Sequence, residues 1–175
     1  RDGNSAVYGY DLSSDTEFAI CNNESYLTSP VISSNIVVWH GNCDGVFNGY
    51  NLDTKEKLTI PNFTPEELDI YGHIVTTREA SDGNHDIYIY NLSSGEKFAV
   101  CTARYAQDHP AISGDIIVWD DFRNGTDPDI YGYNLETGEE FAVCTNRAGQ
   151  YFPAVSANIA VWMDSRNGNS DIYGA

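Results

Sequence analysis

The stretch DIYGYNL at residues 129–135 decides the fold, because the chain contains it several times over. Close copies occupy residues 6–12, 46–52 and 86–92, and a truncated copy, DIYG, occupies residues 171–174. Equivalent residues recur at intervals of 40 to 43 positions. A period in this range is typical of the four-stranded blade of a β-propeller.

Each repeat predicts four short strands. Around the quoted stretch they are residues 110–113, 116–119, 129–135 and 140–144, which are rich in Val, Ile, Tyr and Phe and are separated by turn residues. No segment keeps a 3.6-residue period, and we expect one helical turn only, at residues 64–67. The sequence therefore predicts an all-β fold, a β-propeller of four-stranded antiparallel blades with about four repeats.

The repeats indicate one propeller segment over the whole chain. Residues 1–5 parallel residues 166–170, so the two ends would compete for one place in a closed ring. We therefore prefer a stretch of a longer propeller, and a four-bladed ring with one displaced end stays open as the alternative. The segment comprises residues 1–175, with repeats at about 1–40, 41–80, 81–123 and 124–165 and a partial repeat at 166–175.

A residue exchange between repeats predicts which strands are neighbours. Where the second strand ends in Trp, the third strand carries Gly; where Thr77 replaces the Trp, Ile89 replaces the Gly. Such an exchange fits a large ring lying over a strand glycine, since packed cores penalise both voids and overpacking. We therefore expect the second and third strands to be adjacent. The pairs are Trp39 with Gly49, Trp119 with Gly132 and Trp162 with Gly174.

Charge and composition exclude two classes of partner. The chain has 9 Lys and Arg against 26 Asp and Glu, a formal net charge of −17, so its field repels nucleic-acid phosphate and anionic membranes. Its 41% of hydrophobic residues is enough for a packed core. Its apolar runs, such as residues 116–119, are too short to cross a bilayer. We expect no nucleic-acid partner and no membrane span within this chain.

The last repeat carries spaced residues that can be compared with known repeats: Gln150, Pro153, Trp162, Asp164, Arg166, Asn167, Gly168, Asp171 and Tyr173. This pattern resembles the TolB-type propeller repeats, in the version found in cell-surface proteins of methanogenic archaea. The resemblance is strongest over residues 107–175 and weakest over residues 41–80. It implies an extracellular or cell-surface location and a binding or structural role, with other surface proteins or glycans as partners. It implies no particular activity, because propellers host many.

Local sequence shows no catalytic signature. The four histidines fall at different repeat positions, and there is no Gly-x-Ser-x-Gly elbow, HExxH motif or phosphate-binding glycine loop. We predict a non-catalytic extracellular or cell-surface module with a structural or adhesive, protein-interaction role. Two alternatives stay open: a carbohydrate-binding, lectin-like propeller, and the propeller domain of a secreted hydrolase or lyase. Titratable residues clustered near the ring centre would favour the enzyme.

Two acidic loops between second and third strands are candidate ligand sites. Each combines oxygen donors with a glycine turn, a composition that suits calcium. Each also contains an arginine, Arg123 or Arg166, which favours a network of Asp–Arg bonds over a bound ion. We predict no cofactor, with calcium open as the alternative. The candidate calcium ligands are Asp121, Asp127, Asp129, Asp164, Asn167, Asn169 and Asp171.

The cysteines leave one disulfide pairing open. Cys21, Cys101 and Cys144 share one repeat position, so we expect buried thiols on different blades, too far apart to bond one another. Cys43 differs, because it lies in a loop on the same rim as the end of the preceding fourth strand. A bridge between Cys21 and Cys43 would therefore join neighbouring blades.

Aromatic residues outside the regular strands are candidate sugar-binding residues. The tyrosines of the third strands alternate regularly, and we expect them to pack between blades. The irregular loop aromatics are the better glycan candidates: Tyr26, Tyr105, Tyr151 and Phe152.

Overall fold

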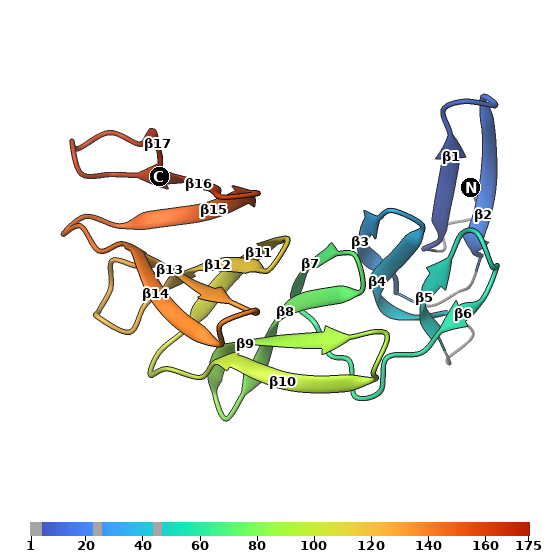
Figure 1. Ribbon diagram of the computed structural model, residues 1–175, viewed down its shortest axis with the longest axis horizontal. Coiled ribbons are helices and arrows are strands. Elements are labelled where there is room, and N and C mark those ends of the chain that lie inside the picture. The colour runs from blue at the N-terminus through green and yellow to red at the C-terminus, as the bar shows by residue number, and fades with distance from the viewer. Residues whose placement is uncertain (1–4, 23–25, 44–46) are drawn as a thin grey trace. The chain divides into compact units, whose positions relative to one another are not determined.

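The computed structural model describes residues 5–22, 26–43 and 47–175 and confirms the all-β fold. Within these ranges every regular element is a strand, and the strands form five antiparallel sheets (Figure 1). The described ranges hold no helix that is long and apolar enough to cross a membrane. The helical turn expected at residues 64–67 is wrong, because Glu67, which would close its capping box, begins a strand and pairs with Arg78 instead.

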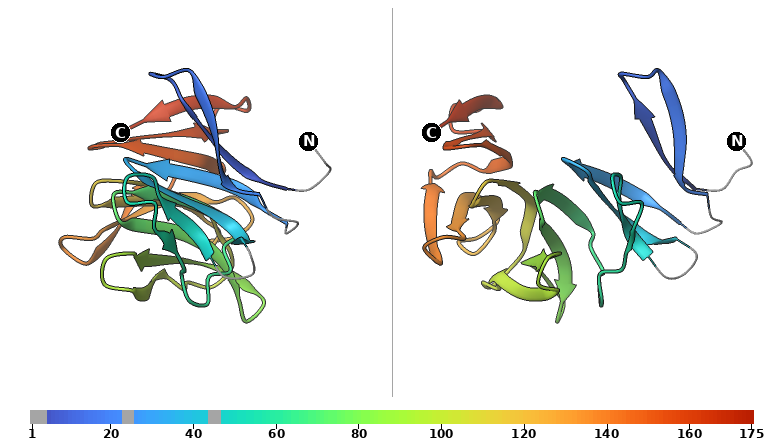
Figure 2. Two further views of the ribbon diagram at one scale, coloured as in Figure 1. Left: turned by 90° about the vertical axis from the view of Figure 1, so that its right-hand side faces the viewer. Right: turned by 45° about the vertical axis from the view of Figure 1, so that its right-hand side comes forward.

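The first of two compact units, Arg1–Thr64, contains two sheets. One is the β1–β2 hairpin, which Figure 2 shows as two antiparallel arms, and the other has the strand order β3-β4-β5-β6. Their bounds are β1 (Val7–Asp11), β2 (Thr16–Cys21), β3 (Thr28–Ser33), β4 (Ile36–Cys43), β5 (Phe47–Asn51) and β6 (Lys57–Leu58).

The second unit, Pro65–Ala175, contains three sheets that follow chain order. Two are complete four-stranded blades and the third has three strands, each antiparallel to its neighbour. The interpretation of residues 1–175 as a single propeller segment stays a prediction. The bounds are β7 (Glu67–Tyr71), β8 (Ile74–Ser81), β9 (Asn84–Asn91), β10 (Glu96–Cys101), β11 (Gln107–Ser113), β12 (Ile116–Asp121), β13 (Asp129–Asn134), β14 (Glu139–Cys144), β15 (Gln150–Ser156), β16 (Ile159–Asp164) and β17 (Asp171–Gly174).

The first strands of these three sheets lie side by side, with β11 between β7 and β15. Carboxylates of β7 accept backbone hydrogen bonds from β11. The backbone nitrogen of His109 donates to Glu67 Oε2 at 2.7 Å, and the backbone nitrogen of Ile112 donates to Asp69 Oδ2 at 2.9 Å. β11 is an edge strand of its sheet, and these bonds satisfy N–H groups there that have no partner strand. They also fix the two sheets relative to each other.

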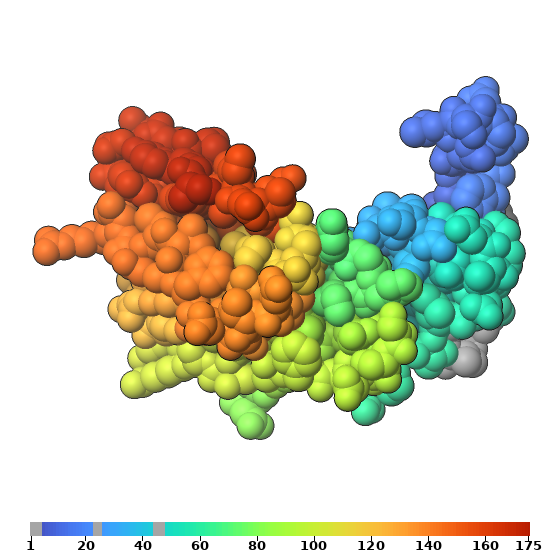
Figure 3. All heavy atoms as spheres, in the orientation of Figure 1, coloured from blue at the N-terminus to red at the C-terminus, as the bar shows by residue number. Residues whose placement is uncertain are grey.

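The core of the second unit lies between its sheets. Trp119 and Ile117 of β12 are fully buried and pack with Ile87 and Ile89 of the preceding sheet. Trp162 of β16 packs with Val118 and Ile130 of the β11–β14 sheet. In the space-filling view (Figure 3) the β11–β14 and β15–β17 sheets lie directly against one another. A strand buried on both faces explains why β12 is a continuous apolar run.

The second and third strands are neighbours, as expected, but the ring over the glycine is not the tryptophan. In the β12–β13 ladder Gly132 faces Val118, whereas Trp119 is one residue further along. Alternation therefore sends the Trp119 ring to the opposite face of the sheet. A Cβ on Gly132 would lie 2.6 Å from Cζ of Phe141, so the fourth-strand phenylalanine takes the space that the glycine leaves.

Candidate functional site

The first acidic loop is tied together by its own side chains. Asp121 is fully buried, and its Oδ2 accepts hydrogen bonds from Trp119 Nε1 at 2.9 Å and from the Arg123 guanidinium at 2.6 Å. The guanidinium lies over the Tyr131 ring, 4.0 Å from its centroid, and reaches Cys101 Sγ of the preceding sheet at 3.1 Å. Burial opposes the charge of Arg123, but its hydrogen bonds, chiefly that with Asp121, raise its pKa.

The second acidic loop repeats this arrangement. Asp164 is fully buried and accepts hydrogen bonds from Trp162 Nε1 at 3.1 Å and from the Arg166 guanidinium. The bond from Arg166 lowers the pKa of Asp164 to about 2. The guanidinium also lies over Tyr173 and reaches Cys144 Sγ at 3.2 Å. Asp121 and Asp164, the two fully buried carboxylates among the candidate calcium ligands, thus already bond to tryptophan and arginine.

The other candidate calcium ligands divide between the two loops. Asp127 and Asp129 line a polar pocket of about 390 Å³ beside Asn124 and Arg147, and Asn124 donates to Asp129 at 2.7 Å.

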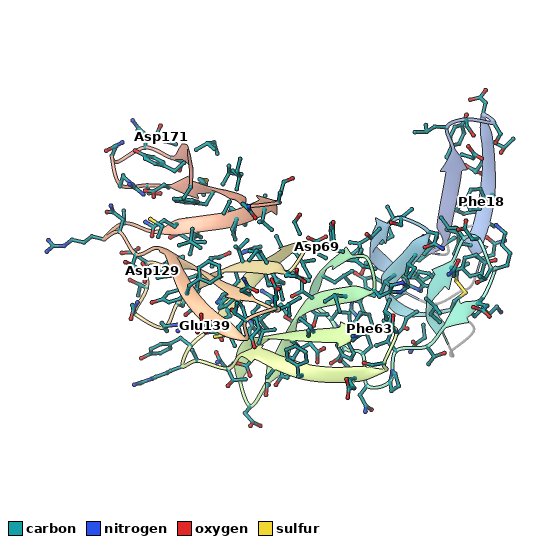
Figure 4. The ribbon with its side chains drawn as sticks, viewed as in Figure 1. Phe18, Phe63, Asp69, Asp129, Glu139 and Asp171 are labelled. Carbon is teal, nitrogen blue, oxygen red and sulfur yellow. A yellow bond between two sulfur atoms is a disulfide. The ribbon has the colours of Figure 1, made fainter. Side chains whose placement is uncertain are left out.

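In the last loop Asn167 donates to Asp171 at 3.4 Å and to the Tyr173 hydroxyl at 2.9 Å, and Asn169 is exposed. Asp129 begins β13 and Asp171 begins β17, so the two labelled side chains in Figure 4 belong to different sheets. No group of three or more His, Cys, Asp or Glu among the described residues is arranged to hold a metal ion.

Cys21 and Cys43 form a disulfide with their Cα atoms 6.0 Å apart (Figure 4). The bridge joins the β1–β2 hairpin to the end of β4. Of the two remaining thiols, Cys101 is buried, which raises its pKa to about 12, and Cys144 is half-buried.

The four glycan candidates have different surroundings. Tyr26 of the first unit is 75% exposed, and Tyr105 of the second is half exposed with the Arg104 guanidinium over its ring. Tyr151 and Phe152 are the second and third residues of β15, with ring centroids 6.3 Å apart. The structure therefore brings Tyr151 and Phe152 into ring contact with each other.

Local sequence reasoning did not predict that His109 lies against Phe152. Both residues precede a proline at the same position of neighbouring first strands, and both have a left-handed backbone, with φ of 52° and 53°. The residue before proline is kept out of the α region, and the left-handed region costs about 1 to 2 kcal/mol. At both positions the strand register shifts, which marks a β-bulge that redirects a side chain. The ring centroids lie 4.4 Å apart with an interplanar angle of 64°.

Carboxylates surround the imidazole of His109. Its Nδ1 lies 3.0 Å from Oδ1 and 3.1 Å from Oδ2 of Asp120, whose side chain is only 1% exposed. Its Nε2 lies 3.5 Å from Oε1 of Glu67 on the neighbouring sheet. The hydrogen bond to Asp120 raises the pKa of His109 against the opposing effect of burial.

Arg78 and His85 extend this group. The Arg78 guanidinium bonds to Glu66 at 2.6 Å and to Asp108 at 2.9 Å, and the His85 nitrogens lie 3.4 Å from the same two carboxylates. The group holds four carboxylates, one guanidinium, two imidazoles and one phenyl ring. We call it the first-strand cluster, and it comprises Glu66, Glu67, Arg78, His85, Asp108, His109, Asp120 and Phe152.

Comparison with known proteins supports the propeller fold. No protein-family model and no curated protein matches the sequence. Among solved structures, the chain is similar to putative TolB from Agrobacterium tumefaciens, with a TM-score of 0.69 and 15% identity over 97% of this chain. It is also similar to the β-propeller domain of the Trilobed protease from Pyrococcus furiosus, with a TM-score of 0.66 and 15% identity over 86% of this chain. An oligogalacturonate lyase in complex with manganese is similar too, with a TM-score of 0.66 and 15% identity over 97% of this chain.

The fold is therefore that of a β-propeller, and more particularly a TolB-like one. The chain spans 65% of the TolB chain, 54% of the protease domain and 53% of the lyase. At these identities the likeness concerns the fold alone, and the similar proteins include enzymes as well as TolB.

Proposed function

We propose that this chain is a non-catalytic β-propeller module of an extracellular or cell-surface protein, with a structural or adhesive role toward other surface proteins. The observation that supports an exported setting is the disulfide between Cys21 and Cys43, since disulfides persist in oxidising compartments and are rare in the cytosol. The net charge of −17 suits a protein that stays soluble in a crowded, salty exterior. The setting we propose, from the repeat resemblance, is the surface of a methanogenic archaeon.

Surface labelling tests the location. A membrane-impermeant biotin reagent is applied to intact cells of the natural source and to a lysate of the same cells. We expect equal labelling of the protein in both samples. Labelling that appears only after lysis would overturn the proposed location.

Bead adhesion tests the role. Beads coated with the whole chain should adhere to source cells more than beads coated with serum albumin do. Protease treatment of the cells should remove that difference if the partner is a surface protein. Equal adhesion of the two kinds of bead would contradict the adhesive role.

A carbohydrate-binding role is the second candidate function. It is supported by the 57% exposure of Phe152 beside an imidazole and several carboxylates, because sugar sites combine an aromatic ring with a few placed polar groups. Binding of the chain to a glycan array tests it.

The hydrolase or lyase alternative has one supporting feature, the orientation of His109 by the buried Asp120, since such a pair suits proton transfer. Glycans bound on the array are incubated with the chain and assayed for new reducing ends or unsaturated products. Product formation that His109→Gln abolishes would favour the enzyme over the non-catalytic module.

A further inference from the structure

We infer that Phe152, Tyr151 and His109 form a sugar-binding surface of the second unit, and that its ligands are uncharged saccharides. The inference rests on the carbohydrate-binding candidate function and specifies where the ligand binds and of which class it is. Five observations carry it: the exposure of one ring, the contacts that fix it, the backbone geometry that directs it, the carboxylates beside it and their excess of negative charge.

The Phe152 ring is exposed and yet held in place. It is 57% exposed, while the imidazole of His109 meets it edge to face at 4.4 Å and Tyr151 lies at 6.3 Å. The exposed face of the ring is apolar area that a ligand can bury, with a gain in free energy. The face of a fixed ring can stack on the apolar face of a sugar without a large loss of side-chain freedom.

A repeated backbone geometry directs these side chains. The position before the first-strand proline is left-handed at Ser29, His109 and Phe152, with φ of 52°, 52° and 53°. The backbone conformation is thus the same while the side chain changes from hydroxyl to imidazole to phenyl. Serine at position 29 shows that this backbone conformation does not need an aromatic side chain. The exposed phenyl ring of Phe152 is therefore not explained by the bulge alone.

Polar groups beside the rings can pair with hydroxyls. Asp108 and Glu67 are partly exposed, with 16% and 29% of their side chains accessible, and His109 has 34%. Carboxylate oxygens accept hydrogen bonds from sugar hydroxyls, and the imidazole pairs with a hydroxyl in either direction. The neighbouring Asp120 fixes the imidazole orientation, so this contact is prepared before the ligand arrives.

The charge of the first-strand cluster selects the ligand class. Four carboxylates stand against one guanidinium, and the two imidazoles add positive charge only where they are protonated. The field at this surface is therefore negative and repels uronates, sialic acids and phosphorylated sugars. Uncharged hexoses and N-acetylated sugars have no such penalty. The oligogalacturonate of the structurally similar lyase belongs to the excluded class.

An oligosaccharide array tests the inference. The probes are matched neutral, N-acetylated, uronate-containing and free-amine oligosaccharides, and the protein is the whole chain with its disulfide intact. We expect binding to the neutral and N-acetylated probes. Phe152→Ala should weaken that binding by at least about tenfold, and Phe152→Trp should retain it.

Tyr71→Ala is the matched control, because Tyr71 is a 51% exposed aromatic at the other end of β7. It should bind as the unmodified chain does, and thermal unfolding of each variant verifies that it is folded. Three results would overturn the inference but leave the carbohydrate-binding function standing. They are binding to uronate probes that equals binding to neutral probes, stronger binding to free-amine probes than to neutral ones, and binding that Phe152→Ala does not weaken. Absence of binding to every probe would overturn both, whereas the surface location depends on the biotin experiment alone.

Discussion

At the residue scale, one pair of positions joins neighbouring sheets by two different chemistries. In the first unit Cys21 and Cys43, 22 residues apart, form a disulfide. In the second unit the same spacing separates Cys101 from Arg123, and there the guanidinium contacts the thiol. Cys43 therefore stands where a later repeat has arginine. A cysteine pair can replace the contact because the backbone already brings the two positions together.

This equivalence predicts that Arg123→Cys will create a second disulfide, with Cys101. Thiol titration in denaturant without reductant should find two reactive thiols in the unmodified chain, Cys101 and Cys144, and a single one in the variant. Arg123→Ala is the control and should leave two. Three reactive thiols in Arg123→Cys would show that the two positions are not equivalent. Stability is not the readout, because losing the guanidinium leaves the buried Asp121 without its positively charged partner.

The strand glycines predict a second effect. Gly132→Val should lower the free energy of unfolding by about 1 to 3 kcal/mol, because its side chain would collide with the ring of Phe141 and approach the carbonyl oxygen of Ile117. Urea unfolding measures the loss. Adding Phe141→Ala should recover part of it by vacating the ring's space. If the double variant is as unstable as the sum of the two single variants, the packing explanation is wrong.

At the element scale, the two acidic loops act as connections between sheets. In each, a carboxylate holds an indole and a guanidinium, and the guanidinium reaches a thiol of the preceding sheet. Removing the guanidinium would leave the buried carboxylate uncompensated, which is strongly destabilising. The same oxygens are therefore not free to coordinate an ion without breaking bonds that already exist.

This arrangement predicts that calcium will not change stability. The melting temperature should be the same with millimolar calcium and with a chelator, because an ion that binds only the folded state would raise it by mass action. Asp164→Asn is the informative variant, and it should lower the melting temperature in both conditions equally. A rise of several degrees on adding calcium, absent in an Asp127→Asn variant, would instead place an ion in the polar pocket.

Most strands and their order in the sheets could be predicted from the sequence. The repeat period gives the length of each sheet unit, and the alternation of apolar residues indicates which side chains are buried. The exceptions are local. At residues 64–67 the pattern of a capping box predicts a helical turn, but pairing of Glu67 with Arg78 in the β7–β8 ladder prevails over local propensity. The tryptophan–glycine exchange identified adjacent strands but assigned the wrong ring, since a volume exchange does not state which face a side chain takes.

At the scale of the whole molecule, the first-strand cluster could not be predicted from the sequence. Its members span Glu66 to Phe152 and come from strands of three sheets, so no local motif contains them. Ser29, His109 and Phe152 each precede the proline of a first strand, but the sequence alone did not single out this position. It did not show that the backbone there is left-handed or that two neighbouring rings meet.

The cluster also predicts how the second unit responds to pH. His109 faces Asp120 from its own sheet and Glu67 from the adjacent one, with Asp108 nearby, and its pKa is raised. A group with a raised pKa in the folded state stabilises the fold fully below its unfolded pKa, near 6.5, and loses that contribution as pH rises through the folded value. Burial also raises the pKa of Asp120, which acts in the same direction at lower pH.

The melting temperature of the unmodified chain should therefore fall between about pH 6 and pH 8 by more than that of His109→Gln. The glutamine keeps a hydrogen-bond donor but carries no titrating group. Thermal unfolding in matched buffers of constant ionic strength measures the difference. Parallel pH profiles for the two proteins would refute an ionised His109 as a link between the sheets.

Under the adhesive role proposed above, the disulfide has a mechanical consequence when tension acts along the chain. Tension applied along the chain straightens unfolded segments, but the backbone between Cys21 and Cys43 is bypassed by the covalent bridge. A sequence separation of 22 residues corresponds to about 75 Å of extension that is withheld at roughly 3.4 Å per residue. In the second unit the thiol–guanidinium contacts at the same spacing are not covalent, so they do not withhold extension in this way. The length between Cys21 and Cys43 is therefore released only when the disulfide is chemically reduced.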